Sequence, residues 1–327
     1  MTNSERIIYE ARRIGFDKAG VVRADALANE RERLEEWLGR GYHGDMAWMA
    51  REPAMRSDPR LLFPPARSVI VVALNYYTPH EHSDEPGTGK VSRYAWGDDY
   101  HDIMRAKLRE LADFVKSIDE AAETRACVDT APIMDKAWAV HAGLGWLGKH
   151  SNLITTELGS WIFIGELLVS LELEEISEPV PDHCGTCTAC LDACPTDAIV
   201  ESYVVDSTRC LSYTTIEFRA PELSDELSKH LNGWLYGCDI CQDVCPWNRF
   251  QKPTGEAGFE PRPGNVSADL GRILSLSPTE YAERFQRSAM KRTKLSGLQR
   301  NARAIIDHEQ NHGSEDRARL SPGEDND

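Results

Sequence analysis

The chain has 327 residues, 41% hydrophobic and 28% charged, which is enough to bury a sizeable core as one large domain with an insert or as two modest domains. Its formal net charge of −16 argues against a general attraction to phosphate or anionic lipid, although a local basic patch can still bind nucleic acid. The first twenty residues contain no uninterrupted hydrophobic run, which excludes a signal peptide or membrane span there and predicts a cytoplasmic protein.

The N-terminal part alternates predicted helices with predicted strands. Apolar residues at helical spacing predict a helix over residues 4–14, with Ser4 as its N-cap and Gly15 as its stop. A short strand over 19–23 and a charged helix over 25–39 follow. This alternation predicts a layered α/β arrangement.

Apolar segments further along the chain predict the core. The Met and Trp residues of HGDMAWMARE (43–52) are expected to be buried, and SVIVVALNYY (68–77) is too apolar to alternate, which predicts a strand covered on both faces. An amphipathic helix is expected over 102–117. A short strand ends in CVDT (127–130), and WIFIGELLVSLEL (161–173) predicts another buried strand or hairpin arm.

The fold class expected from these elements is mixed, α+β or α/β. Residues 1–173 would form an N-terminal α/β sandwich, and residues 174–255 a ferredoxin-like insert. Residues 256–306 would form a helical, basic segment. The tail over 307–327 has almost no apolar residues and is expected to be disordered.

Nine cysteines carry the clearest chemical signal. Residues 184–195 read CGTCTACLDACP, the C-x2-C-x2-C-x3-C-P run of bacterial ferredoxins with two 4Fe–4S clusters. Residues 238–246 read CDICQDVCP, the same motif with Leu235 in place of its first cysteine. The isolated Cys210 can supply the missing ligand.

Cross-ligation between the two runs, as in bacterial ferredoxins, assigns the ligands. One cluster would take Cys184, Cys187, Cys190 and Cys245, and the other Cys194, Cys210, Cys238 and Cys241. A structural zinc site could use similar C-x2-C pairs, but two C-x3-C-P endings fit zinc poorly. Cys127 beside a predicted strand is expected to be a small buried residue.

A second constellation, VDTAPIMDKAWAVHAGLGWLGKHSNLI, occupies residues 128–154. Its GLGWLG (143–148) matches G-x-G-x-x-G, but it follows a predicted helix instead of a strand, which argues against a nicotinamide site. Asp129 could act as a general acid if burial raised its pKa. From the residues alone, a carboxylate before a turn is more often a helix N-cap, and both interpretations stay open at this point.

These motifs together resemble the epoxyqueuosine reductases, cobalamin-dependent iron–sulfur enzymes that complete queuosine in tRNA. The resemblance rests on VSRYAWGDDYH, the 128–154 segment, GSWIFIGELL, CLSYTTIE and GCDICQDVCPWN, and it spans about residues 4–306. It implies that cobalamin lies between the N-terminal domain and the two clusters. The substrate would be epoxyqueuosine at the tRNA wobble position, which two electrons and two protons convert to queuosine and water.

The resemblance also implies roles for particular residues. Asp129 would be the proton donor, which reverses the preference for capping. Contacts to cobalamin map onto Arg56, Tyr94, Asp129, Leu153, Ser212, Asp239 and Ile240. From the residues alone, Arg56 could be an ordinary surface ion pair and Ser212 a local cap, and Tyr94 could merely crowd the cobalt face. The D-x-H-x-x-G pattern is absent, so no histidine of that motif is expected on cobalt.

A basic stretch over residues 284–303 is the candidate contact for tRNA. It contains no acidic residue, and its cations are Arg284, Arg287, Lys291, Arg292, Lys294, Arg300 and Arg303. A solvated helix face is the alternative. Longer relatives continue into helical repeats, so this chain is expected to contact tRNA at fewer points. The partners implied are tRNA and an unidentified low-potential electron donor; no membrane is implied, and the protein is expected to be a monomer.

Two other classes of protein compete with this interpretation. A corrinoid-dependent reductive dehalogenase would share the cofactors, but the Arg12–Arg13 pair lies in an amphipathic helix without the apolar run of an export signal. A ferredoxin-like electron carrier fused to a binding domain would need no cobalamin.

Overall fold

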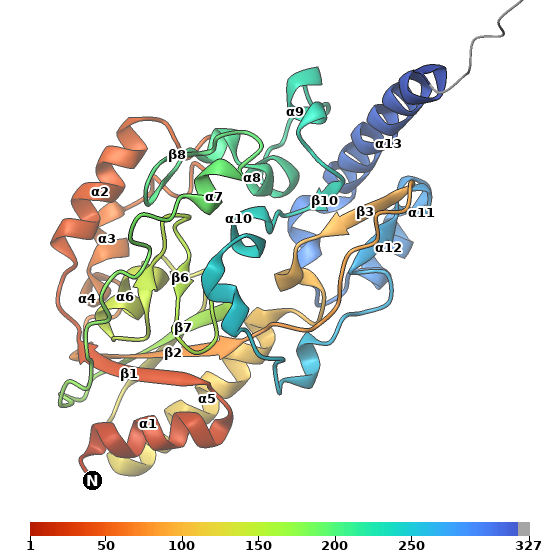
Figure 1. Ribbon diagram of the computed structural model, residues 1–327. Helices are drawn as coiled ribbons and strands as arrows, with labels where there is room; N and C mark the ends of the chain where they lie inside the picture. Colours follow the sequence, from red (N-terminus) through yellow and green to blue (C-terminus); the bar gives the residue numbers. More distant parts are fainter. Residues whose placement is uncertain (320–327) are drawn as a thin grey trace, which may run out of the picture.

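Two β-sheets organise the computed structural model, which describes residues 1–319 (Figure 1). The larger sheet has the order β1-β2-β7-β4 and the smaller one β10-β3-β11, with two short pairs, β5-β6 and β8-β9. The strands are β1 (Lys18–Arg23), β2 (Ser68–Asn75), β3 (Thr88–Val91), β4 (Thr124–Cys127), β5 (Trp146–Leu147), β6 (Leu153–Ile154), β7 (Ile162–Val169), β8 (Ile199–Glu201), β9 (Val204–Val205), β10 (Trp234–Tyr236) and β11 (Ser267–Asp269).

Most helices are short, and the two longest are α5 and α13. The α-helices are α1 (Asn3–Ile14), α2 (Ala28–Gly39), α3 (Pro53–Ser57), α4 (Pro59–Leu62), α5 (Tyr100–Ile118), α6 (Asp135–His141), α7 (Ala189–Asp192), α8 (Leu211–Ile216), α9 (Asp225–Lys229), α10 (Ile240–Asp243), α11 (Leu270–Ser275), α12 (Pro278–Arg284) and α13 (Lys294–Arg319). The 3-10 helices are η1 (Arg93–Ala95), η2 (Ser207–Arg209), η3 (Pro246–Phe250), η4 (Ala257–Phe259) and η5 (Ala289–Thr293).

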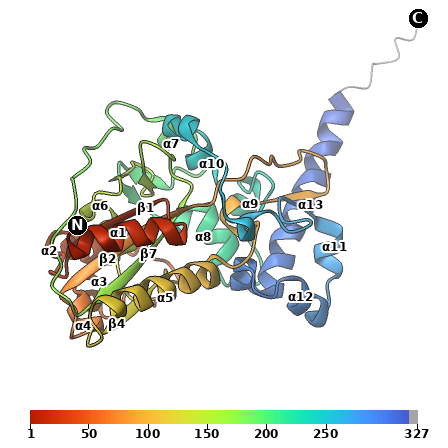
Figure 2. The same ribbon diagram turned by 90° about the horizontal axis from the view of Figure 1, so that it is seen from below.

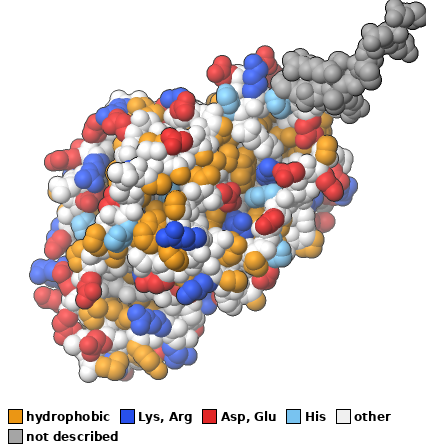
Figure 3. Space-filling model, in the orientation of Figure 1, with side chains coloured by type: hydrophobic (Ala, Val, Ile, Leu, Met, Phe, Trp, Pro, Cys, Tyr) orange, Lys and Arg blue, Asp and Glu red, His pale blue; other side chains and the backbone are white. Residues whose placement is uncertain are grey.

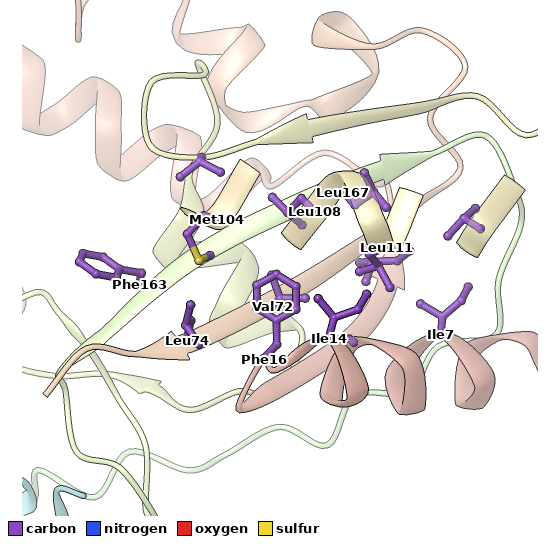
Figure 4. Close-up of a cluster of buried hydrophobic side chains, with 14 of the residues drawn as sticks. Ile7, Ile14, Phe16, Val72, Leu74, Met104, Leu108, Leu111, Phe163 and Leu167 are labelled. Carbon is purple, nitrogen blue, oxygen red and sulfur yellow. The ribbon is translucent and has the colours of Figure 1, made fainter. Parts of the chain in front are cut away.

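The larger sheet is covered on both faces. All eight residues of β2 are buried, which confirms the strand expected there. On one face Val72 and Leu74 pack with Leu108 and Leu111 of α5 and with α1 (Figure 4). Figure 1 shows α1 and α5 below the sheet, and in Figure 2, which is seen from below, both helices lie in front of it. On the other face β2 packs against α6, where Trp138 is almost fully buried. Every pairing in this sheet is antiparallel.

The smaller sheet joins segments from all three predicted regions. Its central strand β3 pairs in parallel with β10 and antiparallel with β11. A second hydrophobic core forms around it from Trp96, Leu235, Leu270 and Phe285. The regions 1–173, 174–255 and 256–306 therefore share one core. The domain division stays a prediction about the order of motifs along the chain.

Three local expectations were wrong. Thr2 caps α1, and Ser4 instead lies buried inside the helix with its hydroxyl donating to the carbonyl of Glu174 at 2.7 Å. Trp48 is 37% exposed and, like Met46, lines a large cavity instead of the core. Helix α13 continues past residue 307 to Arg319, where disorder was expected; residues 320–327 lie outside the described part.

No helix within the described residues is both long enough and apolar enough to cross a membrane.

A buried polar network fastens the second cysteine motif to the larger sheet. The Asn248 side-chain oxygen accepts from the backbone N–H of Ser160 at 2.7 Å, and its Nδ2 donates to the carbonyl of Gln242 at 2.6 Å. The Gln242 amide in turn donates to the carbonyl of Ser160 at 3.1 Å. Gly159 makes room for this network, since a Cβ on it would lie 2.1 Å from Asn248 Oδ1, and its φ is +69°.

We expect Gly159→Ala to lower the free energy of unfolding by roughly 1–3 kcal/mol, because alanine is strained at positive φ and would push Asn248 out of the network. Chemical unfolding of the variant and the parent measures this difference. Gly255→Ala is the matched control, since nothing lies within 4 Å of its Cβ position, and it should change stability by less than about 0.5 kcal/mol. Equal effects at both positions would contradict the role given to Gly159.

Candidate functional site

Four cysteines surround a small cavity between the two cysteine motifs. Its volume is about 180 Å³, and its lining includes Cys184, Cys187, Cys190 and Cys245. Trp247 also lines it, and its ring packs edge-to-face on that of Trp146 with the ring centroids 4.9 Å apart. Three of these cysteines come from the first motif and one from the second, the grouping that cross-ligation predicts.

The other four cysteines of the predicted ligand sets open onto a much larger cavity of about 1,610 Å³. Cys194, Cys210, Cys238 and Cys241 all line it. Cys127, by contrast, is 1% exposed in the core beside β4 and lines neither cavity, which confirms the expected burial.

Burial disfavours the charged form of these thiols. It raises the pKa of Cys190 to about 11 and shifts the pKa of Cys210, Cys238 and Cys241 upward as well. Thiolates in such walls need a compensating positive charge, which iron can supply. Among the described residues, no three His, Cys, Asp or Glu side chains lie close enough together to bind one single metal ion.

Six of the seven residues expected to contact cobalamin line the large cavity: Arg56, Tyr94, Asp129, Ser212, Asp239 and Ile240. Leu153 does not. Its side chain is 2% exposed and packs in the core on the α6 face of the sheet. The cavity wall next to it is formed by residues 150–152, and the contact of Leu153 with cobalamin stays a prediction.

The cavity fits a large polar cofactor. A drug-sized ligand occupies about 300–1,000 Å³, and this cavity exceeds that range. Arg56 offers an unused donor: its Nη2 donates to the carbonyl of Trp48 at 3.0 Å, but its buried Nε has no partner among the described residues. No carboxylate bonds to it, so the surface ion pair considered for Arg56 is not formed.

Asp129 stands at the end of β4 with its side chain 63% exposed to the cavity. It caps no helix, since α6 begins six residues later after Met134, and its own φ is +50°. Its Oδ2 lies 3.3 Å from Nε2 of His101, whose Nδ1 lies 2.6 Å from Oδ1 of Asp99. The three side chains form one chain of hydrogen bonds into the cavity.

The hydrogen bonds between these three side chains shift the pKa values of His101 and Asp129 in opposite directions. Burial alone would lower the pKa of His101, but its hydrogen bonds to Asp129 and Asp99 outweigh burial and raise that pKa to about 9. For Asp129 burial acts in the opposite direction, and the bond from His101 outweighs it and holds the pKa of Asp129 below its usual value. At neutral pH the proton of the pair therefore resides mainly on His101.

Two further carboxyl groups lie behind Asp129. Asp135 accepts from the backbone N–H of Asp129 at 3.3 Å, and burial raises the pKa of Asp135 to about 6. Glu166 on β7 is completely buried beside Asp135, and burial followed by the Asp135 charge raises the pKa of Glu166 well above its ordinary value. Burial thus favours the neutral form of Glu166 at the centre of the sheet.

Asp239 joins the second cysteine motif to the smaller sheet. Its carboxylate accepts from the Ser92 hydroxyl and, at 2.7 Å, from the backbone N–H of Arg93. The next residue, Tyr94, donates its hydroxyl to that of Tyr236 at 3.1 Å. Ser212 follows Cys210 at the start of α8, and no side chain caps that helix, so the capping alternative for Ser212 was wrong.

Some cations of the basic stretch over residues 284–303 lie at the rim of the large cavity, and at least one is buried in the interior. Exposed Lys291, Arg292 and Lys294 line the large cavity. Arg292 is paired with Glu217 at 2.7 Å, and Arg287 with Asp102 at 3.0 Å, so acids from elsewhere in the chain do compensate part of this stretch. Figure 3 shows acidic and basic side chains interspersed over one face of the molecule.

Arg300 does not belong to a phosphate-binding surface. It is 5% exposed, and its guanidinium donates to the carbonyls of Phe218, Ala220 and Thr214 at 2.8–2.9 Å. The expectation for this residue was wrong because sequence charge does not reveal that a cation tethers the 214–220 segment from inside.

Several functional side chains were missed from the sequence: His101, Asp135, Lys136, His150 and Glu166. One signal was present, since Glu166 is the single charged residue of the apolar run of β7. Lys136 is fixed by bonds of 2.8 Å to the Ser151 carbonyl and to Asn152 Oδ1. Its place on the cavity wall follows only from the fold.

Comparisons with known families agree on one group of proteins. The family described as "Epoxyqueuosine reductase QueG, DUF1730" matches residues 56–130, and the "4Fe-4S double cluster binding domain" matches residues 183–248. An epoxyqueuosine reductase of Cellulophaga algicola is 48% identical over 299 residues, which cover 91% of this chain and 96% of the relative. One from a Synechocystis species is 49% identical over 276 residues, 84% of this chain and 94% of the relative.

Solved structures show the same similarity. A crystal structure of epoxyqueuosine reductase with an epoxyqueuosine-modified stem loop of tyrosine tRNA superposes with a TM-score of 0.86 at 35% identity, over 93% of this chain and 80% of that one. A structure of the Bacillus subtilis enzyme, with an aspartate catalytic loop swung out of the active site, superposes with a TM-score of 0.86 at 31% identity, over 98% and 86% of the two chains.

The raised pKa of Glu166 predicts a pH-dependent stability. In the unfolded chain its pKa is about 4.5 and in the folded protein it is higher, so above pH 4.5 folding takes up a proton and becomes less favourable as pH rises. We expect Glu166→Gln to remove this dependence and to gain stability relative to the parent between pH 5.5 and 7.5, by at most about 1.4 kcal/mol per pH unit.

Guanidinium unfolding of both proteins at the two pH values measures the difference. Glu172→Gln on the exposed loop after β7 is the control, and its difference from the parent should not change with pH. A Glu166→Gln difference that is equally flat would show that Glu166 is ionised in the fold.

Proposed function

The chain belongs to the epoxyqueuosine reductase family and reduces epoxyqueuosine to queuosine in tRNA, and from that premise we propose how its residues divide the reaction. Membership at this identity and coverage overturns the electron-carrier and dehalogenase alternatives. The observation that carries the proposal is that a candidate acid, Asp129, and four cluster cysteines open onto one cavity.

The eight cysteines would hold two 4Fe–4S clusters. Cys184, Cys187, Cys190 and Cys245 would bind one, and Cys194, Cys210, Cys238 and Cys241 the other. The support is that each set lines a different cavity and that the double-cluster domain matches this segment. Sets drawn from both motifs keep the two clusters adjacent, as electron transfer between them requires.

Cobalamin would occupy the large cavity. The residues proposed to contact it are Arg56, Tyr94, Asp129, Leu153, Ser212, Asp239 and Ile240, and all of these except Leu153 line that cavity. When bound, cobalamin supplies a strongly reducing cobalt centre for a substrate that the clusters cannot reach directly. The free Nε donor of Arg56 suits a phosphate or amide oxygen of such a cofactor.

Asp129 would deliver the proton that the epoxide oxygen requires. Removing this oxygen as water and forming the ring double bond takes two electrons and two protons, and the oxygen is a poor leaving group until it is protonated. Nε2 of His101 holds a proton 3.3 Å from Asp129 Oδ2, so His101 can transfer this proton to the Asp129 carboxylate, which delivers it to the substrate oxygen. Asp99 keeps His101 oriented and charged.

The anticodon arm would reach the cavity along its basic rim. Lys291, Arg292 and Lys294 lie there, and Arg51 and Arg105 line the same cavity. Phosphate contacts of this kind position a nucleic acid without reading its sequence.

We further propose that the enzyme works as a monomer in the cytoplasm and takes single electrons from a low-potential donor.

Asp129→Asn should lower turnover about 10²–10⁴-fold, because an amide cannot donate the proton that general acid catalysis supplies. Anaerobic assay on tRNA bearing epoxyqueuosine, with cofactor content verified by iron analysis and visible absorption, measures the change. Asp113→Asn on the exposed face of α5 is the control. Retained turnover in Asp129→Asn would assign proton delivery to another group.

Cys210→Ser should reduce the iron content from about eight to about four per chain, because it removes a ligand of only one 4Fe–4S cluster. Cys127→Ser is the matched control and should retain about eight. Iron and sulfide analysis after anaerobic reconstitution decides between them. Full iron content in Cys210→Ser, or zinc in the parent protein, would refute the ligand assignment.

Replacing both rim lysines with glutamine, Lys291→Gln with Lys294→Gln, should weaken tRNA binding and reduce the slope of log affinity against log salt by about 0.7–0.9 for each phosphate that the protein no longer neutralises. Binding titrations at several salt concentrations measure the slope. Arg303→Gln removes an exposed cation that does not line the cavity and should leave the slope unchanged. If Arg303→Gln matched the double variant, the basic rim would not be the specific contact.

A further inference from the structure

His150 occupies a position that the proposed reaction does not explain. It lies in the loop between β5 and β6, is 4% exposed, and lines both the small and the large cavity. Among the described residues it is the only one that lines both. It therefore stands between the two sets of four cysteines.

The hydrogen bonding of the ring determines which nitrogen carries the proton. The backbone N–H of Asn152 donates to Nδ1 at 3.2 Å, so Nδ1 is an acceptor and the hydrogen of the neutral ring is on Nε2. Nε2 is buried and has no partner among the described residues. A buried donor left unpaired costs about 1–3 kcal/mol, so the protein retains it at the expense of stability unless a ligand accepts from it.

The small cavity that His150 lines offers sulfur acceptors, since Cys184, Cys187, Cys190 and Cys245 line it as well. The Lys149 ammonium is a donor only and cannot accept from Nε2; it donates to the carbonyls of Gly185 and Cys187 at 2.7 and 2.9 Å. Ile154 completes the wall next to His150 in the small cavity and offers no polar group there. Gly148 keeps the ring in place, since a Cβ at that position would lie 3.0 Å from its Cε1.

We propose that His150 donates its Nε2–H to a sulfur atom of the cluster held by Cys184, Cys187, Cys190 and Cys245, and thereby raises the reduction potential of that cluster. The inference rests on the proposed cluster binding. A hydrogen bond to sulfur stabilises the reduced cluster, because reduction adds negative charge that the donor partly neutralises. His150 would thus be a positioning and tuning residue that makes this cluster easier to reduce.

His150→Leu removes the donor and keeps an apolar side chain. In the anaerobically reconstituted protein, a redox titration followed by electron paramagnetic resonance should show one cluster becoming about tenfold harder to reduce, equivalent to about 59 mV for a one-electron couple. The affected signal should be the one that survives in Cys210→Ser. His141→Leu, on the exposed end of α6, should match the parent, and His150→Gln, which restores an N–H, should recover part of the potential.

Unchanged potentials in His150→Leu at full iron content would overturn the proposal, as would a shift confined to the other cluster. If His150→Leu takes up less iron, the test is made on the wild-type protein instead. Pulsed electron paramagnetic resonance of its reduced cluster, with ¹⁵N-labelled histidine, should detect coupling to an imidazole nitrogen. Absence of this coupling would overturn the proposal. A parent protein that binds no iron would instead refute the cluster assignment itself, which the iron analysis reveals separately.

Discussion

The attachment of the second cysteine motif to the two sheets is the constraint on which the rest of the structure depends. Asn248 and Gln242 bind the turn before β7, and Asp239 binds the start of η1. These bonds are buried, so breaking any one leaves polar groups without water or partner. Because they hold residues 238–248 in place, Cys245 meets the first motif while Cys238 and Cys241 face the large cavity.

The same burial that holds the motif in place also controls protonation around Asp129. Asp135 lines the cavity and Glu166 lies behind it, and burial raises the pKa of both carboxyl groups. Asp129 itself is ionised because His101 contributes a positive charge. A carboxylate–imidazolium pair at the cavity, with two carboxyl groups of raised pKa behind it, keeps one mobile proton where the substrate oxygen would arrive. This arrangement suits a reaction that consumes protons.

Much of this protein could be predicted from the sequence, because the residues that carry the signal lie close together along the chain. Cluster ligands are separated by two or three residues, so their geometry is largely local, and the two ligand sets were assigned from spacing alone. The fully buried β2 was evident from its composition, and Gly15 from its place after the last apolar residue of α1. Resemblance of the motifs to a family then supplied Asp129 and five of the cavity contacts.

Other features depended on distant segments meeting, and no local pattern reveals such meetings. Asp99 and His101 reach Asp129 only because α5 starts beside the end of β4, and Arg300 is buried only because α13 packs over the 214–220 segment. Leu153 is buried because it packs in the core on the α6 face of the larger sheet, which no local pattern reveals. The sequence by itself determined which residues could bind iron. Only the tertiary structure decided which groups share a proton, and which buried donor, His150, is left facing the cysteines, because both depend on burial and distance.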